Sequence, residues 1–196
     1  MNNKFKDVVI KLRRCGFFND YQHLSDDQLV DRIIQEGKKH DKYGEFSEIL
    51  EDSSQDDLFF SMQIANLDKK KVWWQDLECD VCRQNKVYKY VVIDFANLSA
   101  GYFNPINVQE VWQTDKGPAI ITFEESGNKY RYEAQYFDDW LDAEIIFSFI
   151  SKIMKDNGSP YEFYIHEESC QDIFTVRATP EERNELKKEL GWELNK

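Results

Sequence analysis

The stretch that most constrains the fold is residues 108–154, in which a two-residue hydrophobic period gives way to a helical one. Residues 119–124 and 130–134 alternate side chains in the manner of strands with one buried and one wetter face. Between them, residues 126–128 (Ser-Gly-Asn) accept the positive φ that a hairpin turn needs. The sequence therefore predicts a β-hairpin, preceded by a short strand at 108–114.

A helix is predicted directly after the hairpin. Its apolar stripe consists of Ile145, Ile146, Phe149, Ile150, Ile153 and Met154. Asp138, Asp139 and Asp142 are candidates to cap its start, and Gly158 is placed to end it. A hairpin and a helix that each have one apolar face bury those faces most simply on each other.

The other elements follow from shorter signals. Residues 3–15 and 26–36 are predicted helices, the second with a capping box from Ser25 to Gln28. Residues 72–98 read as one long helix or two short ones, although β-branched residues near Val91 leave a strand open. The remaining expected elements are strands at 161–166 and 173–178 and a helix whose N-cap is Thr179 and whose first residue is Pro180.

These elements predict an α+β protein. Residues 1–100 form a helical region, and residues 101–196 form an antiparallel α+β region with the order β-β-β-α-β-β-α. The sheet is expected to have about five strands, and the whole chain to make one compact domain. Helices segregated from consecutive strands argue against a doubly wound parallel fold.

Charge and composition exclude several classes of function. The 196 residues carry a formal net charge of −12, which repels phosphate backbones and argues against nucleic-acid binding unless a basic patch is concealed. The same charge suits a basic protein partner, or serves only solubility. The chain has no run of about 18 apolar residues and no signal-peptide pattern at its start, so we expect a cytoplasmic protein without a membrane span. Four cysteines are too few for a disulfide scaffold.

Four residues have the types and part of the spacing of a tetrahedral zinc site, namely Cys79, Cys82, His166 and Cys170. The two halves are far apart in sequence, and the CxxC pair falls within a predicted helix rather than a knuckle. The acidic neighbours of Cys79 raise rather than lower a thiol pKa, which disfavours a redox pair. The sequence contains no phosphate-binding, dinucleotide-binding, hydrolase or calcium-loop motif. A structural zinc protein remains one alternative, and we otherwise expect no cofactor.

Aromatic and acidic side chains crowd the hairpin and the segment after it, and such combinations recur at protein interfaces. The candidate partner-binding residues are Trp112, Asp138, Asp139, Trp140, Glu167 and Glu168. The competing interpretation is that the rings form the core under the sheet. The composition is similar to that of small, acidic bacterial immunity proteins, which block basic toxin domains. The first hypothesis is therefore a non-catalytic protein-binding module of inhibitor or immunity type.

A small-molecule-binding protein or an enzyme is the second hypothesis. Its pocket would lie between sheet and helix and would be lined by Tyr130, Tyr132, Tyr164 and Arg177. A buried Arg177 that faces a cavity would favour this hypothesis, whereas an Arg177 paired with a surface glutamate would disfavour it.

Overall fold

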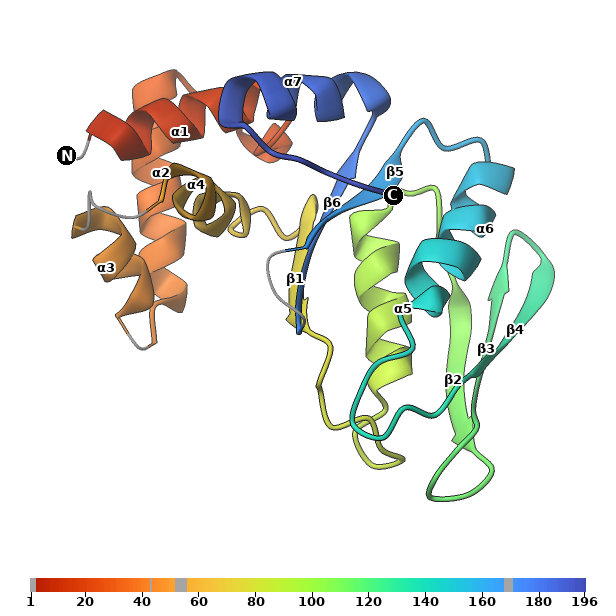
Figure 1. The fold of residues 1–196 in the computed structure, drawn as a ribbon. Coiled ribbons are helices and arrows are strands. Elements are labelled where there is room, and N and C mark those ends of the chain that lie inside the picture. Colours follow the sequence, from red (N-terminus) through yellow and green to blue (C-terminus); the bar gives the residue numbers. More distant parts are fainter. Residues whose placement is uncertain (1–2, 43, 52–55, 168–170) are drawn as a thin grey trace. The chain divides into compact units, whose positions relative to one another are not determined.

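The computed structural model describes residues 3–42, 44–51, 56–167 and 171–196 (Figure 1). The chain forms two compact units: unit 1 comprises Met1–Val72 and Pro180–Leu194, and unit 2 comprises Trp73–Thr179 and Asn195–Lys196. Unit 1 is therefore assembled from two segments that are distant in sequence, whereas nearly all of unit 2 is one continuous segment.

Unit 1 is built from helices. Its elements are α1 (Asn3–Arg14), the 3-10 turn η1 (Asn19–Tyr21), α2 (Asp26–His40), α3 (Glu45–Glu51), α4 (Asp57–Ala65) and α7 (Pro180–Leu190). The helices predicted at 3–15, 26–36 and from Pro180 onward are confirmed. The buried side chains of α1 are Phe5, Val8, Val9 and Leu12, as its apolar stripe requires.

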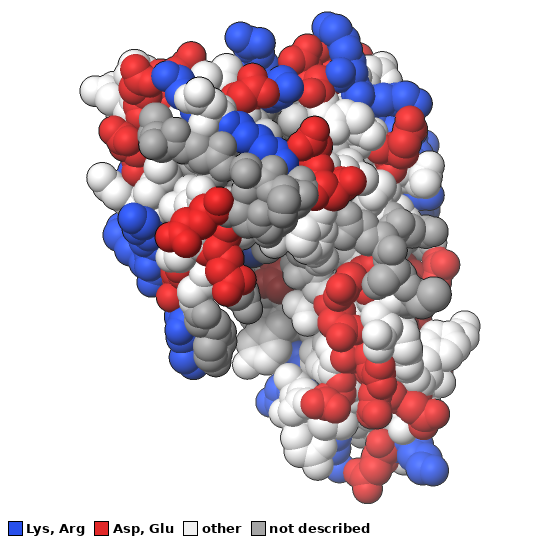
Figure 2. Space-filling model, turned by 60° about the vertical axis from the view of Figure 1, so that its left-hand side comes forward, with Lys and Arg blue, Asp and Glu red and all other residues white. Residues whose placement is uncertain are grey.

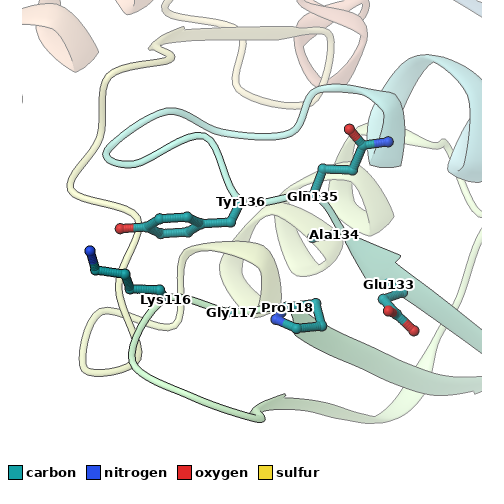
Figure 3. Close-up of a pocket in the computed structure, with 7 residues that line it drawn as sticks. All are labelled: Lys116, Gly117, Pro118, Glu133, Ala134, Gln135 and Tyr136. Atoms are coloured by element: carbon teal, nitrogen blue, oxygen red, sulfur yellow. The ribbon is translucent and has the colours of Figure 1, made fainter.

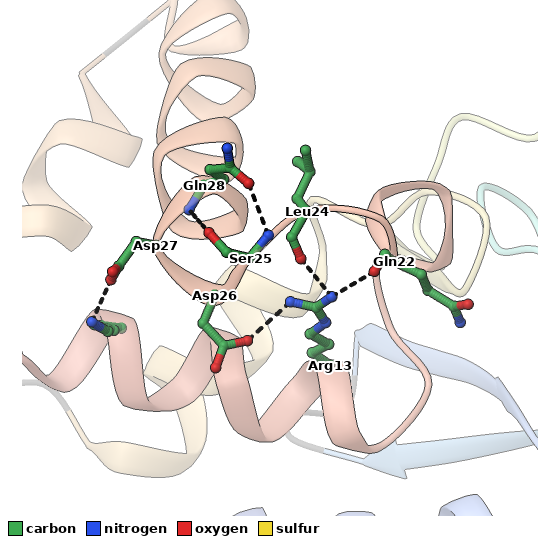
Figure 4. Close-up of polar contacts among 8 residues, drawn as sticks. Arg13, Gln22, Leu24, Ser25, Asp26, Asp27 and Gln28 are labelled. Carbon is green, nitrogen blue, oxygen red and sulfur yellow. Dashed lines mark hydrogen bonds and ion pairs between the residues drawn. The ribbon is translucent and has the colours of Figure 1, made fainter.

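Helix α2 begins with the predicted capping box (Figure 4). The backbone N–H of Gln28 donates to Ser25 Oγ (3.3 Å), and the Ser25 N–H donates to Gln28 Oε1 (2.9 Å). From α1, Arg13 Nη1 pairs with Asp26 (2.9 Å), and its Nη2 donates to the carbonyls of Gln22 and Leu24 (2.8 Å each). Polar contacts thus join the end of α1 to the start of α2.

Helix α2 continues through Gly37 to His40, beyond its predicted last residue, 36. The glycine makes room for the ring of Phe46, since a Cβ at position 37 would lie 2.4 Å from that ring. The absence of a side chain here serves packing rather than helix termination.

Lys71 is buried, although the lysine run 69–71 reads as a solvated loop in the sequence. Its side chain is 1% exposed and pairs with Glu182 at 2.9 Å. Its Nζ also donates to the carbonyls of Cys15 (3.1 Å) and Gly16 (2.9 Å), which follow the end of α1. The lysine thereby satisfies carbonyl groups that a helix end leaves without partners.

Unit 2 contains strands and helices. They are β1 (Val72–Asp76, which starts at the last residue of the first segment of unit 1), α5 (Val87–Leu98), β2 (Ile106–Trp112), β3 (Ala119–Glu125), β4 (Asn128–Ala134), the π-helical segment η2 (Ile145–Ile150), α6 (Ser151–Asp156), β5 (Glu162–Glu167) and β6 (Asp172–Ala178). The predicted hairpin is confirmed as β3 and β4, and the predicted helix after it as η2 and α6.

The strands form two sheets, so the expected single sheet of about five strands is wrong. One sheet has the order β1-β6-β5 and the other the order β2-β3-β4. The β2–β3, β3–β4 and β5–β6 pairs are antiparallel. The class is α+β as predicted, but the six strands are divided because β5 and β1 both pair with β6 and not with the strands of the β2-β3-β4 sheet.

The helical interpretation of residues 72–98 is also wrong in its first part. Val72–Asp76 is strand β1, and the helix begins only at Val87. The neighbour of β1 in its sheet is β6, about a hundred residues later in the chain. A local pattern cannot reveal such a neighbour, and β propensity depends on that kind of context.

Helices cover the apolar faces of both sheets within unit 2. The ring of Phe95 on α5 contacts Trp73 (5.2 Å between centroids) and Phe163 (4.8 Å) of the β1-β6-β5 sheet. In η2, Phe149 contacts the β2-β3-β4 sheet through Phe123, Tyr130 and Tyr132. These contacts form one buried cluster that fixes the two segments described next.

Candidate functional site

Two segments that follow strands of different sheets lie side by side in unit 2. Residues 77–81 follow β1, and residues 137–141 come shortly after β4. The N–H of Cys79 donates to the carbonyl of Asp139 (2.9 Å), and the N–H of Leu141 donates to that of Leu77 (2.8 Å). A bridge between Glu78 and Trp140 completes the pairing. Sequence positions about sixty residues apart therefore share one surface.

This pairing gathers five carboxylates, which we call the acidic surface: Asp76, Glu78, Asp80, Asp138 and Asp139. Four of the five side chains are exposed, and Asp76 is half-buried. In the part of the chain that the structure describes, none of the five forms an ion pair. Figure 2 shows acidic side chains gathered in a continuous column at the lower right of that view.

Acidic side chains elsewhere are more often neutralised. In unit 1, Asp20 pairs with Lys70 (2.6 Å), Asp26 with Arg13 (2.9 Å) and Asp57 with Lys4 (2.8 Å). Where residues 76–80 meet 138–139, by contrast, the described part of the chain supplies five neighbouring carboxylates with no ion pair.

Aromatic side chains adjoin the acidic surface. Tyr136 is 38% exposed and Phe137 is 49% exposed, while Trp140 is partly buried. The ring of Trp112, which is only 6% exposed, packs edge-on against Tyr136 with 6.5 Å between centroids. The indole Nε1 of Trp112 donates to Glu110 Oε1 (2.6 Å), and this hydrogen bond holds the tryptophan ring in its orientation.

A buried carboxylate holds the second segment in place. Asp142 is 4% exposed, and its Oδ2 accepts from the Tyr132 hydroxyl (2.9 Å) and from the N–H of Gln135 (2.8 Å). Its Oδ1 accepts from the N–H of Glu144 (3.2 Å), and its own N–H donates to the Tyr88 hydroxyl (3.1 Å). Residues 135–142 are thus tied to both β4 and α5. Preorganisation of this kind lowers the entropy cost of binding.

The negative charge affects neighbouring side chains. Partial burial, followed by the hydrogen bond and charge of Asp138, raises the pKa of the Tyr136 phenol. Burial, followed by the charges of Asp76 and Asp80, raises the pKa of the Cys79 thiol. Both groups are therefore neutral at physiological pH, and Cys79 lacks the thiolate character of a nucleophile.

A surface pocket of about 500 Å³ lies next to Tyr136 (Figure 3). Figure 3 shows the Tyr136 ring beside Lys116 on one side of it and Glu133, on β4, on the other. A Cβ at Gly117 would lie 3.3 Å from the Cβ of Tyr136, so this glycine allows the turn to approach the ring. The pocket borders the aromatic part of the candidate surface.

The structure brings together some of the partner-binding candidates and not others. Asp138, Asp139 and Trp140 lie together on the paired segments. Trp112 is in the core and supports Tyr136 from below instead of facing solvent. The side chain of Glu167 and all of Glu168 lie outside the described residues.

The four residues of the alternative ligand pocket are spread over two sheets. Tyr130 and Tyr132 are on β4 and pack against Phe149. Tyr164, on β5, pairs in register with Val176, whereas Arg177 pairs with Phe163. Because successive residues of a strand point to opposite faces, Tyr164 and Arg177 lie on opposite faces of their sheet.

The zinc candidates are only partly described. Cys79 and Cys82 lie in the connection between β1 and α5, not in a helix, and His166 is on β5. Cys170 lies outside the described residues. Within the described ranges, no group of three or more His, Cys, Asp or Glu side chains is arranged to hold a metal ion.

Sequence reasoning missed the first segment of the acidic surface. The predicted helical region 72–98 includes Asp76, Glu78 and Asp80, and a helix there gives no indication of their neighbours across the surface. The one available signal was the alternation of acidic residues at positions 76, 78 and 80, which is typical of an extended segment with one polar side.

No protein-family model matches this chain, and neither a curated protein nor a solved structure matches it. Of the helices in the described ranges, none is both long enough and apolar enough to cross a membrane.

Proposed function

We propose that this chain is a non-catalytic, cytoplasmic protein-binding module that uses the acidic surface to bind a basic protein, in the manner of an inhibitor or immunity protein. The observation that carries the proposal is the meeting of residues 76–80 with 138–139, which collects five carboxylates without cationic partners among the described residues. Exposed Phe137 and Tyr136 lie beside them.

Electrostatics explains why such a surface suits a basic partner. Like charges that lie close together repel, and a partner's Lys or Arg side chains relieve that repulsion while attracting the partner over a distance of about 10 Å. Complementary charge raises association rates and rejects acidic competitors, including nucleic acids. Among the described residues these carboxylates have no cationic partner, whereas many others are paired.

The aromatic side chains supply the apolar contact that charge alone lacks. Binding energy at protein interfaces is concentrated in a few aromatic and arginine side chains surrounded by polar ones. Phe137, which is 49% exposed, and Tyr136, which rests on Trp112, fit this role. A guanidinium group of the partner would also stack favourably on either ring.

The test is a capture experiment followed by titration with the captured protein. The tagged chain is incubated with lysate of its native cells at low and high salt, and bound proteins are identified by mass spectrometry. We expect one basic protein in stoichiometric amount, released by salt. The identified protein is then titrated against the double variant Asp80→Asn/Asp139→Asn.

A matched control separates local charge from net charge. Asp31 and Glu48 are exposed residues of unit 1, so the double variant Asp31→Asn/Glu48→Gln changes the net charge by the same amount. We expect the first double variant to bind about tenfold more weakly, since each lost pair is worth up to about 1 kcal/mol. The control should bind like the unaltered protein. Equal effects of the two double variants would refute the proposed surface.

A further inference from the structure

Arg177 is a buried cation that has no anionic partner within the described ranges. It lies on β6, where its residue is 7% exposed. No hydrogen-bond acceptor in the described part of the chain meets its Nε, and no ion pair of that part includes it. Buried charges in proteins are otherwise paired or bound to an ion, and this chain has 37 acidic residues that could have supplied a partner.

A carboxylate on the neighbouring strand is directed elsewhere. Glu162 on β5 pairs in register with Ala178, so it lies on the face of the sheet opposite to Arg177. It is already engaged by Lys196 at 2.7 Å and by the hydroxyl of Tyr164. The sheet therefore separates Arg177 from this carboxylate.

What Arg177 does contact is aromatic. Its guanidinium carbon lies 4.3 Å from the centre of the Tyr161 ring, and Tyr161 packs against Tyr102 with 6.0 Å between centroids. Stacking on a ring stabilises a cation modestly and holds the guanidinium plane in a fixed orientation. It leaves the in-plane N–H groups, which are the ones that bind carboxylates and phosphates, without acceptors from this contact.

A second unused polar atom lies on the same face of the same strand. Thr175 is fully buried, and its Oγ1 has no hydrogen-bond partner among the described residues. Two residues along a strand span roughly 6.6 Å and point the same way. Buried polar groups without partners are rare, and a pair of them on one face indicates a ligand, ion or water that both would contact.

We propose that Arg177 and Thr175 form a binding site for an oxyanion, the carboxylate or phosphate of a small molecule, with Tyr161 as the wall that orients the guanidinium. Arginine matches both groups because its parallel N–H bonds meet two oxygens at once. Such an anion reaches Arg177 through the part of the residue that remains exposed to solvent, 7%. This site is separate from the acidic surface and does not depend on the function proposed for it.

The probes are inorganic phosphate and malonate, with chloride at matched ionic strength as the reference. Their binding to the full chain is measured by calorimetric titration and by the rise in melting temperature, and the bound location by amide chemical-shift changes. We expect saturable binding of at least one probe, with shifts centred on Tyr161, Thr175 and Arg177. Phosphate and malonate distinguish a phosphate ligand from a carboxylate ligand.

Variants assign the binding to this arginine. Arg177→Met keeps the apolar stem and should abolish saturable binding. Arg131→Met is the control, because Arg131 lies in the same unit, is exposed and pairs with Glu133 at 2.8 Å; it should bind the probe normally. If Arg177→Met does not fold, Arg177→Lys keeps the charge without the planar fork and should bind at least about tenfold more weakly.

Two results would overturn the proposal. One is that neither phosphate nor malonate binds the unaltered protein saturably, which would make Arg177 a structural side chain held only by Tyr161. The other is that binding persists in Arg177→Met, or that the shifts centre on residues away from β6, which would place the anion elsewhere.

Discussion

The Nζ of Lys71 lies 2.9 Å from Oε1 of Glu182, in a pair that joins residues 111 positions apart. The lysine is almost fully buried, whereas the glutamate is 24% exposed. Lys71, the residue before β1, also binds the carbonyls of Cys15 and Gly16. Its amine therefore connects the end of α1 to the first turn of α7. This pairing leads to the first two predictions.

Replacing Lys71 by methionine should lower the free energy of unfolding by about 3 kcal/mol, because it leaves buried carbonyl groups without a donor. The neighbouring Lys70 is the control. It is 69% exposed and pairs with Asp20 on the surface, so Lys70→Met should cost less than about 1 kcal/mol. Urea unfolding of both variants checks the difference, and similar losses would show that the buried amine has no special structural role.

Gly16→Ala should destabilise the protein more than Gly101→Ala. Both glycines have positive φ, 79° and 88°, so each substitution carries a backbone cost of about 1–2 kcal/mol. At Gly16 the new Cβ would also lie 2.2 Å from Glu182 Oε1 and 2.8 Å from Lys71 Nζ, whereas at Gly101 it meets nothing within 4 Å. Melting temperatures measured side by side test this, and equal shifts would mean that the ion pair moves aside freely.

Alkaline pH should destabilise the protein in part through Cys15. Burial, followed by the charges of Glu189 and Glu185, raises the pKa of its thiol from 9.0 to about 11. Between these values the folded state holds a proton that the unfolded state has lost, so this contribution is complete below pH 9 and falls as pH rises to 11. Urea unfolding from pH 8 to 11 should show a shallower decline for Cys15→Ala, and parallel declines would contradict the assignment.

Tyr132→Phe should reduce stability by about 2 kcal/mol, because it removes a hydrogen bond to the buried Asp142 carboxylate. Tyr130 lies on the same face of β4, and no hydrogen bond of its hydroxyl is found within the described residues. Tyr130→Phe should therefore change stability by under about 0.5 kcal/mol. Hydrogen exchange of residues 135–142 should also accelerate in Tyr132→Phe alone; unchanged exchange would show that Asp142 does not anchor this segment.

Phe137→Ala should separate binding from folding. The side chain is 49% exposed, so its removal should alter the free energy of unfolding by no more than about 0.5 kcal/mol. As an interface anchor its loss should weaken binding of the basic partner by about 2 kcal/mol, or roughly thirtyfold. Chemical unfolding and titration with the partner measure the two effects. Undiminished affinity would show that Phe137 is not part of the binding surface.

Local signals in the sequence predicted the elements whose pattern is complete within one segment. The Ser25–Gln28 capping box and the turn at 126–128 both lie where the sequence placed them. Strand β1 was missed, because Val72–Asp76 becomes a strand only through its neighbour β6. The division into two sheets depends in the same way on long-range pairing.

The candidate site was predictable only in part. Asp138, Asp139 and Trp140 were recognised from their composition, but Glu78 and Asp80 join them through backbone pairing that no spacing reveals. The sequence also does not show whether an aromatic ring points into the core or into solvent. Trp112, a candidate for the surface, lies in the core. Burial of a single lysine in a run of three, Lys71, also depends on contacts distant in sequence.

The order of the two units along the chain has a consequence for synthesis on the ribosome. Helix α7 belongs to unit 1 but follows nearly all of unit 2, namely Trp73–Thr179. Helices α1 to α4 therefore leave the ribosome long before Glu182 is synthesised. During that interval Lys71 lacks this ion-pair partner and can remain in water. Unit 2 has nearly all of its residues earlier and can fold first. Helix α7 thus completes unit 1, which reaches its final stability only after α7 has been translated.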